Sequence, residues 1–423
     1  MVLYSSAHQY KTNVQYRKIW RTLTMSLLLR NRGAILLLML NIFIIFTGIG
    51  LIVPIMPSYM NMLHINGSML GLLVAAFSIT QLIFSPLAGR LSDTIGRKKV
   101  ILAGMLLFAV SEWMFGAVST LPLLFLARML GGISAALVMP AVMAYTADVT
   151  TDEERGKGMG FINAAITTGF IIGPGIGGYI AEFGIRIPFY AAAVGGLLAM
   201  LLSALFLPEV SKDAHAQNAV KPVQIGLLRQ LMNSYRAPYF ISLIVVFVAS
   251  FGLANFETVF GLFVDHKFGF TPKDIAFIIT FGSVAGAVVQ ITIFGWIINQ
   301  FGEKKVITVS LFVSALFTVL ALLVHSFWLM VAVTFVLFLA IDLLRPAIGT
   351  QMSKFAAEQQ GYVAGLNSAF TSLGNIIGPI VAGALFDFNI GYPYLLAGVV
   401  LFLGFILSFR SKETPHSAVK SEN

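Results

Sequence analysis

The chain has 423 residues, of which 58% are hydrophobic and 11% are charged, and its formal net charge is +9. The hydrophobic residues fall in blocks of about 20, the length that a helix needs to cross the hydrocarbon layer of a membrane. This pattern predicts an all-α integral membrane protein, because a membrane barrel would show shorter segments of alternating polarity. The chain has no cysteine, which excludes disulfides and thiolate metal sites.

Twelve apolar segments are long enough to be transmembrane helices. They cover residues 34–57, 68–89, 99–119, 122–147, 158–182, 187–207, 238–264, 273–298, 305–325, 327–351, 361–386 and 391–409. No cleavable signal sequence is visible, since the first long apolar block begins near Gly33 and is itself of spanning length. The tail before it has an amphipathic pattern between Tyr16 and Leu27 that suggests a helix in the membrane interface; a disordered tail or a translation start at Met25 are the alternatives.

The positive charges are distributed unevenly between the two sides that these spans define. Of the 27 Lys and Arg residues, 22 lie on the side of the N-terminus, three lie on the opposite side, and Arg128 and Arg345 lie within spans. The positive-inside rule therefore predicts that both termini are cytoplasmic. The net charge reflects topology and attraction to anionic lipid, and does not indicate nucleic-acid binding.

The two halves of the chain repeat each other at a spacing near 206 residues. The segment GRLSDTIGRKKVI (89–101) aligns with GWIINQFGEKKVI (295–307), and Gly173-Pro174 aligns with Gly378-Pro379. Several matches at one offset indicate a duplication, with the halves related by an axis along the membrane normal. We expect an N-terminal tail (1–33), a six-helix bundle (34–207), a cytoplasmic linker (208–237), a second six-helix bundle (238–410) and a C-terminal tail (411–423).

Five charged residues lie inside the predicted spans and away from the span ends: Glu112, Arg128, Glu257, Asp342 and Arg345. An ionised side chain at a helix centre costs roughly 2.5 to 3.5 kcal/mol, so each position invites a functional interpretation. Asp342 and Arg345 are three residues apart, so they can pair on one helix face. The alternative is that this nearly neutral pair only packs its helix against a neighbour.

Glu257 has no basic residue within three turns of its own span until Lys267. Burial favours the neutral form of such an acid, which suits a group that takes up and releases protons. We therefore expect Glu257 to be the principal proton-binding residue, with Asp342 as a second acid held by Arg345; a permanently protonated or water-solvated Glu257 is the alternative. Glu112 is expected in the outer third of its helix, reaching water or a neighbour.

Several motifs resemble those of the major facilitator superfamily, over nearly the whole chain beyond residue 33. The loop G-x-x-x-D-x-x-G-R-K-K (89–99) looks like the signature loop of that superfamily, and GFIIGPGIGGYI (169–180) resembles its antiporter motif. With GIGLIVPIMP and LARMLGGISAA the match narrows to the twelve-helix drug:proton antiporters, and NFETVFGLF and IDLLRPAI are similar to segments of Gram-positive quinolone and multidrug efflux pumps. The resemblance implies two six-helix bundles and proton-driven export of amphipathic, often cationic or zwitterionic, drugs by alternating access.

The resemblance also implies roles for individual residues. Candidates for the drug cavity are Phe46, Ile49, Phe77, Gln81, Thr167, Phe170, Phe256, Phe260, Phe338 and Asn375. Gate and antiporter positions are Gly89, Asp93, Gly96, Arg97, Gly169, Gly173, Pro174, Gly177 and Gly178. Asp93 is expected to bridge to the other half and close the cytoplasmic side. Arg128 resembles the arginine of an R-x-x-Q-G motif, with Gly131 in place of the glutamine; it is expected to bias a cavity acid or to cap a helix junction.

The same resemblance implies protons as the coupling ion, no cofactor, amphipathic drugs as substrates, a bacterial cytoplasmic membrane and function as a monomer. No G-x-x-x-x-G-K-[ST] loop occurs, which disfavours ATP as the energy source. The six histidines lie in tails, loops or span ends, so the clustered groups of a membrane enzyme are not evident. The alternative within the superfamily is an exporter or symporter of a specific metabolite or sugar.

Overall fold

The computed structural model describes residues 28, 33–209, 234–236, 239–356 and 360–410. The predicted interfacial helix of the N-terminal tail and most of the predicted linker lie outside these residues. The described part of the chain is helical and contains no strand. Eleven of its helices are long and apolar enough to cross a membrane, and the last predicted span is a shorter apolar helix, Tyr392–Ser408. The prediction of an all-α membrane protein is confirmed.

The described helices fall into two successive sets along the chain, one over residues 33–206 and one over residues 234–408. The first set is a helix over residues 33–52, continued by η1 (Val53–Ile55) and α2 (Met56–Leu63), then α3 (Gly67–Ile95), α4 (Arg97–Ala117), α5 (Leu121–Val149), α6 (Asp152–Ile180), η2 (Ala181–Phe183) and α7 (Ile187–Phe206). The second set is η4 (Ser234–Arg236), α9 (Phe240–Phe268), α10 (Pro272–Thr292), α11 (Phe294–Phe301), α12 (Glu303–Leu320), η5 (Ala321–Leu323), α13 (Phe327–Ala356), α14 (Gln360–Phe388) and α15 (Tyr392–Ser408). We call these sets the N half and the C half.

Local sequence signals place several helix ends. The Asn66 side chain accepts a hydrogen bond from the backbone NH of Met69 at 3.1 Å and so caps the start of α3. Thr271 begins α10 with a capping box, in which its hydroxyl and the Asp274 carboxylate each bond the other residue's backbone NH. Gly96 and Gly302, which the repeat aligns, end α3 and α11 with φ of +104° and +76°, values that favour glycine.

The helix predicted over residues 273–298 is divided in the structure. α10 ends at Thr292 and α11 begins at Phe294, with Ile293 between them. The hydroxyl of Thr292 donates to the carbonyl of Val288 at 2.6 Å, and such back-bonding competes with the helical ladder and bends helices. The repeat-related α3 runs through the same region without a break.

The most extensive contacts between the halves are those of α3 with α14 and of α6 with α10. Their contacts repeat the internal symmetry: Gly71 of α3 lies against Pro379 of α14, and Gly178 of α6 lies against Ala276 of α10, so closely that an added Cβ would overlap. Gly71 and Ala276 are 205 residues apart, the offset found in the sequence. Small residues thus let backbones of the two halves approach closely.

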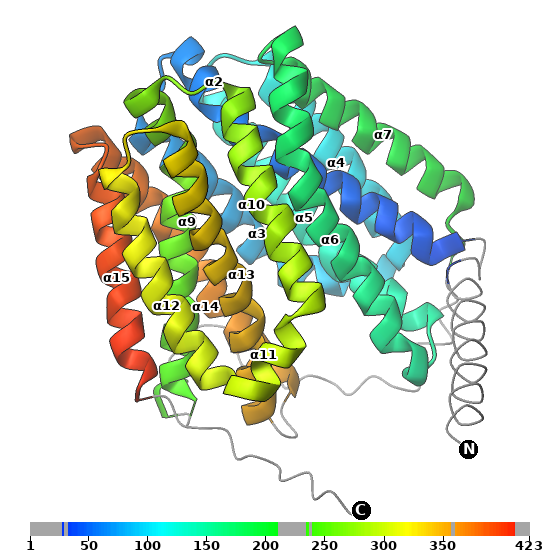
Figure 1. The fold of residues 1–423 in the computed structure, drawn as a ribbon. Coiled ribbons are helices and arrows are strands. Elements are labelled where there is room, and N and C mark those ends of the chain that lie inside the picture. The colour runs from blue at the N-terminus through cyan, green and yellow to red at the C-terminus, as the bar shows by residue number, and fades with distance from the viewer. Residues whose placement is uncertain (1–27, 29–32, 210–233, 237–238, 357–359, 411–423) are drawn as a thin grey trace, which may run out of the picture.

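The contacts between the halves gather at one end of the molecule. We call this the sealed end, where α2 meets α3 and α9 meets α10, and we call the opposite end, with Gly96 and Gly302, the basic end. At the sealed end Asn61 donates to Asp265 at 3.1 Å, and Asp387 accepts from the backbone NH of Gly67 at 2.7 Å. Figure 1 shows α6 and α10 side by side toward the top, while the lower end of α6 lies apart from α11.

The hydrophobic cores are divided in the same way. One buried cluster draws on both halves, for example Tyr59 and Phe115 with Phe256 and Phe386. The other two clusters each stay within one half, residues 34–207 in one and 239–401 in the other. The halves therefore share a core at the sealed end and have separate cores toward the basic end, which leaves the space between them accessible from the basic end.

Candidate functional site

Glu257 is the one exposed residue of α9 in the described stretch from Tyr239 to Asp265. Its neighbours Phe256 and Phe260 are each only 1% exposed. Because α9 is covered on its other faces by α14, α15 and α13, the accessible surface of Glu257 faces the space between the halves. The acid that the sequence singled out thus lies where water entering from the basic end can reach it.

The Asp342 carboxylate packs against α10 at Gly286, where an added Cβ would overlap it. Within the described residues, no hydrogen bond or ion pair joins Asp342 to Arg345. The predicted local pair is therefore wrong for this conformation, because the carboxylate occupies the gap that a glycine leaves in the facing helix. Helix spacing showed that Asp342 and Arg345 could meet. They do not meet here, because the neighbouring helix α10 offers a gap at Gly286 that the Asp342 carboxylate occupies.

Arg345 is exposed, and its charge acts on both Glu257 and Asp342. The three residues therefore form one electrostatic cluster that spans α9 and α13. The expectation that Glu257 lacks a basic neighbour considered only its own helix, and the structure corrects it. One cation shared by two acids suits a site that exchanges a proton or a cationic guest for another positive charge.

The aromatic candidates of the C half are packed together in this conformation. The ring centres of Phe256 and Phe260 lie 5.2 Å apart, and those of Phe256 and Phe338 lie 6.1 Å apart. Phe338 fills the space beside Gly282, where an added Cβ would come within 2.6 Å of the ring. Tyr394 closes the cluster from α15, 5.4 Å from Phe256. These rings pack against the helix that carries Glu257, and they cover one another's faces.

The candidates of the N half are more accessible. Phe46 and Phe170 meet edge to face with ring centres 4.8 Å apart, and Phe170 is 43% exposed. Thr167, one turn earlier on α6, is exposed. The remaining candidates are partly buried: Ile49, Phe77, Gln81 and Asn375. The structure therefore brings Phe46, Phe170 and Thr167 together as an open aromatic surface on this side.

The antiporter motif of α6 packs against other helices through two faces. Gly169 and Gly173 face the first helix, where an added Cβ would come within 2.9 Å of the Phe43 carbonyl and 2.7 Å of the Thr47 carbonyl; Gly177 continues this face. Gly178 points instead to α10 in the other half. One face of the motif thus holds α6 within its own half, and the other forms the contact between halves. Pro174 packs on the first helix beside the same glycines.

The charged residues of the loop at the basic end contact other residues of the N half. Arg97 contacts Asp93, donates to Ser92 at 2.8 Å and pairs with Asp148 at 3.2 Å, all within the N half. The Asp93 side chain is 62% exposed, and no added Cβ would meet any atom within 4 Å at Gly89 or at Gly96. In this conformation Asp93 does not reach the C half within the described residues, as the open basic end requires.

The C half carries a charge-reversed copy of this pair that sequence reasoning missed. Lys354 contacts Glu303, which is 4% exposed. Glu303 follows Arg97 by 206 residues, and Lys354 follows Asp148 by the same 206. The repeat offset, applied to Asp148, would have found it.

Glu112 on α4, which is buried, and Arg128 on α5, which is half-buried, form a further charged region. Glu112 is 4% exposed, so it does not reach water as expected; the charge that acts on it is Arg128. At Gly131 an added Cβ would come within 2.8 Å of the Ser111 hydroxyl oxygen. Glycine at this motif position therefore allows α4 and α5 to approach.

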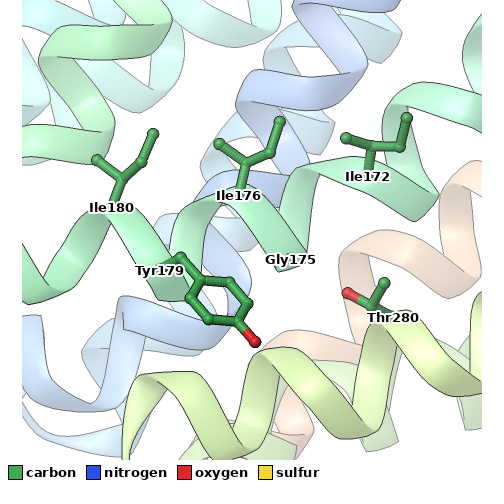
Figure 2. A pocket seen from close by; sticks show the side chains of 6 residues that line it. All are labelled: Ile172, Gly175, Ile176, Tyr179, Ile180 and Thr280. Carbon is green, nitrogen blue, oxygen red and sulfur yellow. The ribbon is translucent and has the colours of Figure 1, made fainter.

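A shallow groove of about 440 Å³ lies between α6 and α10 at the sealed end, and neither Glu257, Asp342 nor Arg345 lines it. Figure 2 shows the residues that line it: Ile172, Ile176, Ile180 and Tyr179 on α6, and Thr280 on α10. The groove follows the contact between the halves, within helices long enough to span the membrane. It is a surface feature of that contact and contains none of the predicted charged groups.

Comparison with known proteins agrees with this architecture. The family model described as Major Facilitator Superfamily matches residues 38–244 and again residues 242–423. The chain belongs to the major facilitator superfamily. It is therefore a multi-pass membrane transporter and not an enzyme, and the family resemblance is confirmed.

Two relatives are similar over nearly their whole length. The chain is 49% identical over 384 residues to Multidrug resistance protein 2 of Bacillus subtilis (strain 168), which covers 90% of this chain and 96% of the relative. It is 40% identical over 381 residues to Quinolone resistance protein NorA of Staphylococcus aureus (strain N315), with the same coverage of 90% and 96%.

Solved structures share the fold at low sequence identity. The nucleoside transporter NupG aligns with a TM-score of 0.71 at 17% identity, covering 89% of this chain and 98% of that chain. A bacterial homologue of the human lysosomal transporter Spinster, in an inward-facing and occupied conformation, aligns with a TM-score of 0.72 at 14% identity, covering 89% and 96%. These likenesses confirm the major facilitator fold.

Proposed function

We propose that this transporter exports amphipathic drugs, including cationic and zwitterionic compounds such as quinolones, in exchange for protons. The observation that carries the proposal is the position of Glu257. This acid is exposed on an otherwise buried helix, faces the space between the halves and shares the charge of Arg345 with Asp342. The relatives named as multidrug and quinolone resistance proteins support the choice of substrate class.

We infer that the protein lies in the bacterial cytoplasmic membrane with both termini in the cytoplasm, because 22 of its 27 Lys and Arg residues lie on that side. The basic end then faces the cytoplasm and the sealed end faces outward. The conformation described above is inward-open, the state that receives a drug from the cell. We propose the monomer as the working unit, with no cofactor.

The exchange follows from charge at one shared site. A cationic drug that enters between the halves competes with the proton on Glu257, because the ionised carboxylate attracts the cation and the protonated, neutral carboxyl does not. The accessible aromatic surface of Phe46 and Phe170 offers stacking and cation–π contact with little demand on shape. After the sealed end opens, the drug leaves and a proton from outside takes its place on the acid.

The proton gradient supplies the energy. Each proton that enters down a potential of about 100 mV supplies roughly 2.3 kcal/mol, which supports about a fiftyfold gradient of a neutral solute. Protonating Glu257 removes a negative charge from the space between the halves, so the closed basic end then no longer encloses an unpaired anion. Binding and release are thereby tied to opposite conformations.

Everted membrane vesicles with a fluorescent cationic dye in the outside solution test this function. We expect dye uptake that stops when an ionophore collapses the proton gradient, and we expect Glu257→Gln to abolish the uptake while the variant remains monodisperse on size exclusion. Glu153→Gln is the matched control, because Glu153 is an exposed acid at the start of α6. Uptake that continues without a gradient, or a fully active Glu257→Gln, would overturn the proposal.

A further inference from the structure

The charged pair of the N half, the buried Glu112 and the half-buried Arg128, is not used by the mechanism above. The guanidinium of Arg128 on α5 lies 4.4 Å from the centre of the Phe115 ring on α4. Glu112 precedes Phe115 by three residues, so its carboxyl and the ring share one face of α4. The Ser111 hydroxyl donates to the Ala127 carbonyl at 2.8 Å and fixes α4 against α5 beside both charges.

Neither charge has found a hydrogen-bond partner. Within the described part of the chain, Glu112 Oε2 and Arg128 Nε are buried and make no hydrogen bond. The two opposite charges act on each other but do not touch. The free-energy cost of removing them from water is therefore largely uncompensated. Glu112 and Phe115 are three residues apart, about 4.5 Å along the helix axis, a distance that an arginine side chain can cover. Arg128 therefore has two sites within reach.

The ring under Arg128 is connected to the contact between the halves. The Tyr59 hydroxyl of α2 donates to the Phe115 carbonyl at 2.5 Å, and their ring centres lie 5.5 Å apart. Two residues after Tyr59, Asn61 donates to Asp265 of α9 across the halves. When the sealed end opens, α2 must part from α9, and the support of the Phe115 ring changes with it.

The other titratable groups around this region are engaged elsewhere. Arg186, before α7, donates to the Ala117 carbonyl at 3.2 Å and to the Ser119 hydroxyl at 2.7 Å. Tyr190 of α7 donates to the Gly116 carbonyl at 3.2 Å. With Tyr59 also bonded to backbone, Arg128 is left as the cation that acts on Glu112.

We propose that Glu112 is a positioning residue for Arg128: the guanidinium lies on Phe115 while the sealed end is closed and moves to the Glu112 carboxylate when that end opens. The pair stabilises the open sealed end, because both charges are satisfied only there. This inference rests on the alternating access of the proposed function. It adds to it a switch in the N half, remote from the proton-binding acid of α9.

The test measures the conformational equilibrium directly. Since the chain has no native cysteine, spin labels can be placed at Phe183→Cys and Phe388→Cys, whose native side chains are 82% and 83% exposed at the sealed end of each half. In proteoliposomes we expect Glu112→Gln to lower the population with a long label distance about tenfold. Glu112→Asp should retain most of it, and Glu153→Gln should equal the unsubstituted sequence.

Two further arms make the outcome decisive. Acidification should lower the long-distance population by protonating Glu112, and this part of the pH response should disappear in Glu112→Gln. Phe115→Leu removes the ring that competes for Arg128 and should raise the long-distance population. This change is opposite in direction to that of Glu112→Gln, and it tests the inference independently if Glu112→Gln does not fold. An unshifted equilibrium in either folded variant, or an unchanged pH response in Glu112→Gln, overturns the inference. Failure of dye transport by the unsubstituted protein would instead refute the proposed function.

Discussion

Replacing Gly178 by alanine should open the sealed end. A Cβ at this position of α6 would lie 2.8 Å from the Pro272 carbonyl oxygen and would overlap Ala276, while ordinary van der Waals contact begins at 3.4 Å. The helices would have to part by about 0.6 Å or more. Overpacking of a close contact costs about 1 to 3 kcal/mol. Since this contact joins the two halves at the sealed end, we expect the cost to fall on the conformation described here.

A cost of this size shifts the equilibrium toward the open sealed end by about 5- to 150-fold. The label pair at Phe183→Cys and Phe388→Cys measures the shift as growth of the long-distance population. Gly160→Ala is the matched control on the same helix, because an added Cβ there meets no atom within 4 Å. Equal distance distributions for Gly178→Ala and Gly160→Ala would refute the packing argument.

Two more predictions concern contacts that sequence reasoning did not find. Asp387→Asn should also raise the long-distance population. Asp387 accepts hydrogen bonds from the backbone NH groups of Gly67 and Ser68 at 2.7 and 2.9 Å at the start of α3, where negative charge is favoured. An unchanged distance distribution would contradict this prediction. Glu303→Lys should lower the thermal unfolding midpoint by placing a cation beside Lys354, and the double variant with Lys354→Glu should recover it, with a coupling of about 0.5 to 3 kcal/mol in a double-mutant cycle. No recovery would mean that the pair contributes nothing to stability.

The sequence by itself determined the class of protein and the order of its apolar helices, and it singled out Glu257 as a candidate functional acid. Apolar blocks of spanning length admit only helices in a membrane, and a carboxyl group among them is too costly to be incidental. The repeat offset even contained the Glu303–Lys354 pair, although only a comparison with Asp148 reveals it. These properties are local or periodic, and so they can be read along one chain.

The tertiary structure decided which charges meet. Asp342 packs against Gly286 and not onto Arg345, and Arg345 acts on Glu257, because facing helices supply gaps and charges that helical spacing cannot show. The same holds for Glu112 and Arg128. Which end is open is also a property of the fold, since both conformations of a transporter use one sequence and differ by only a few kcal/mol in how the same surfaces pack.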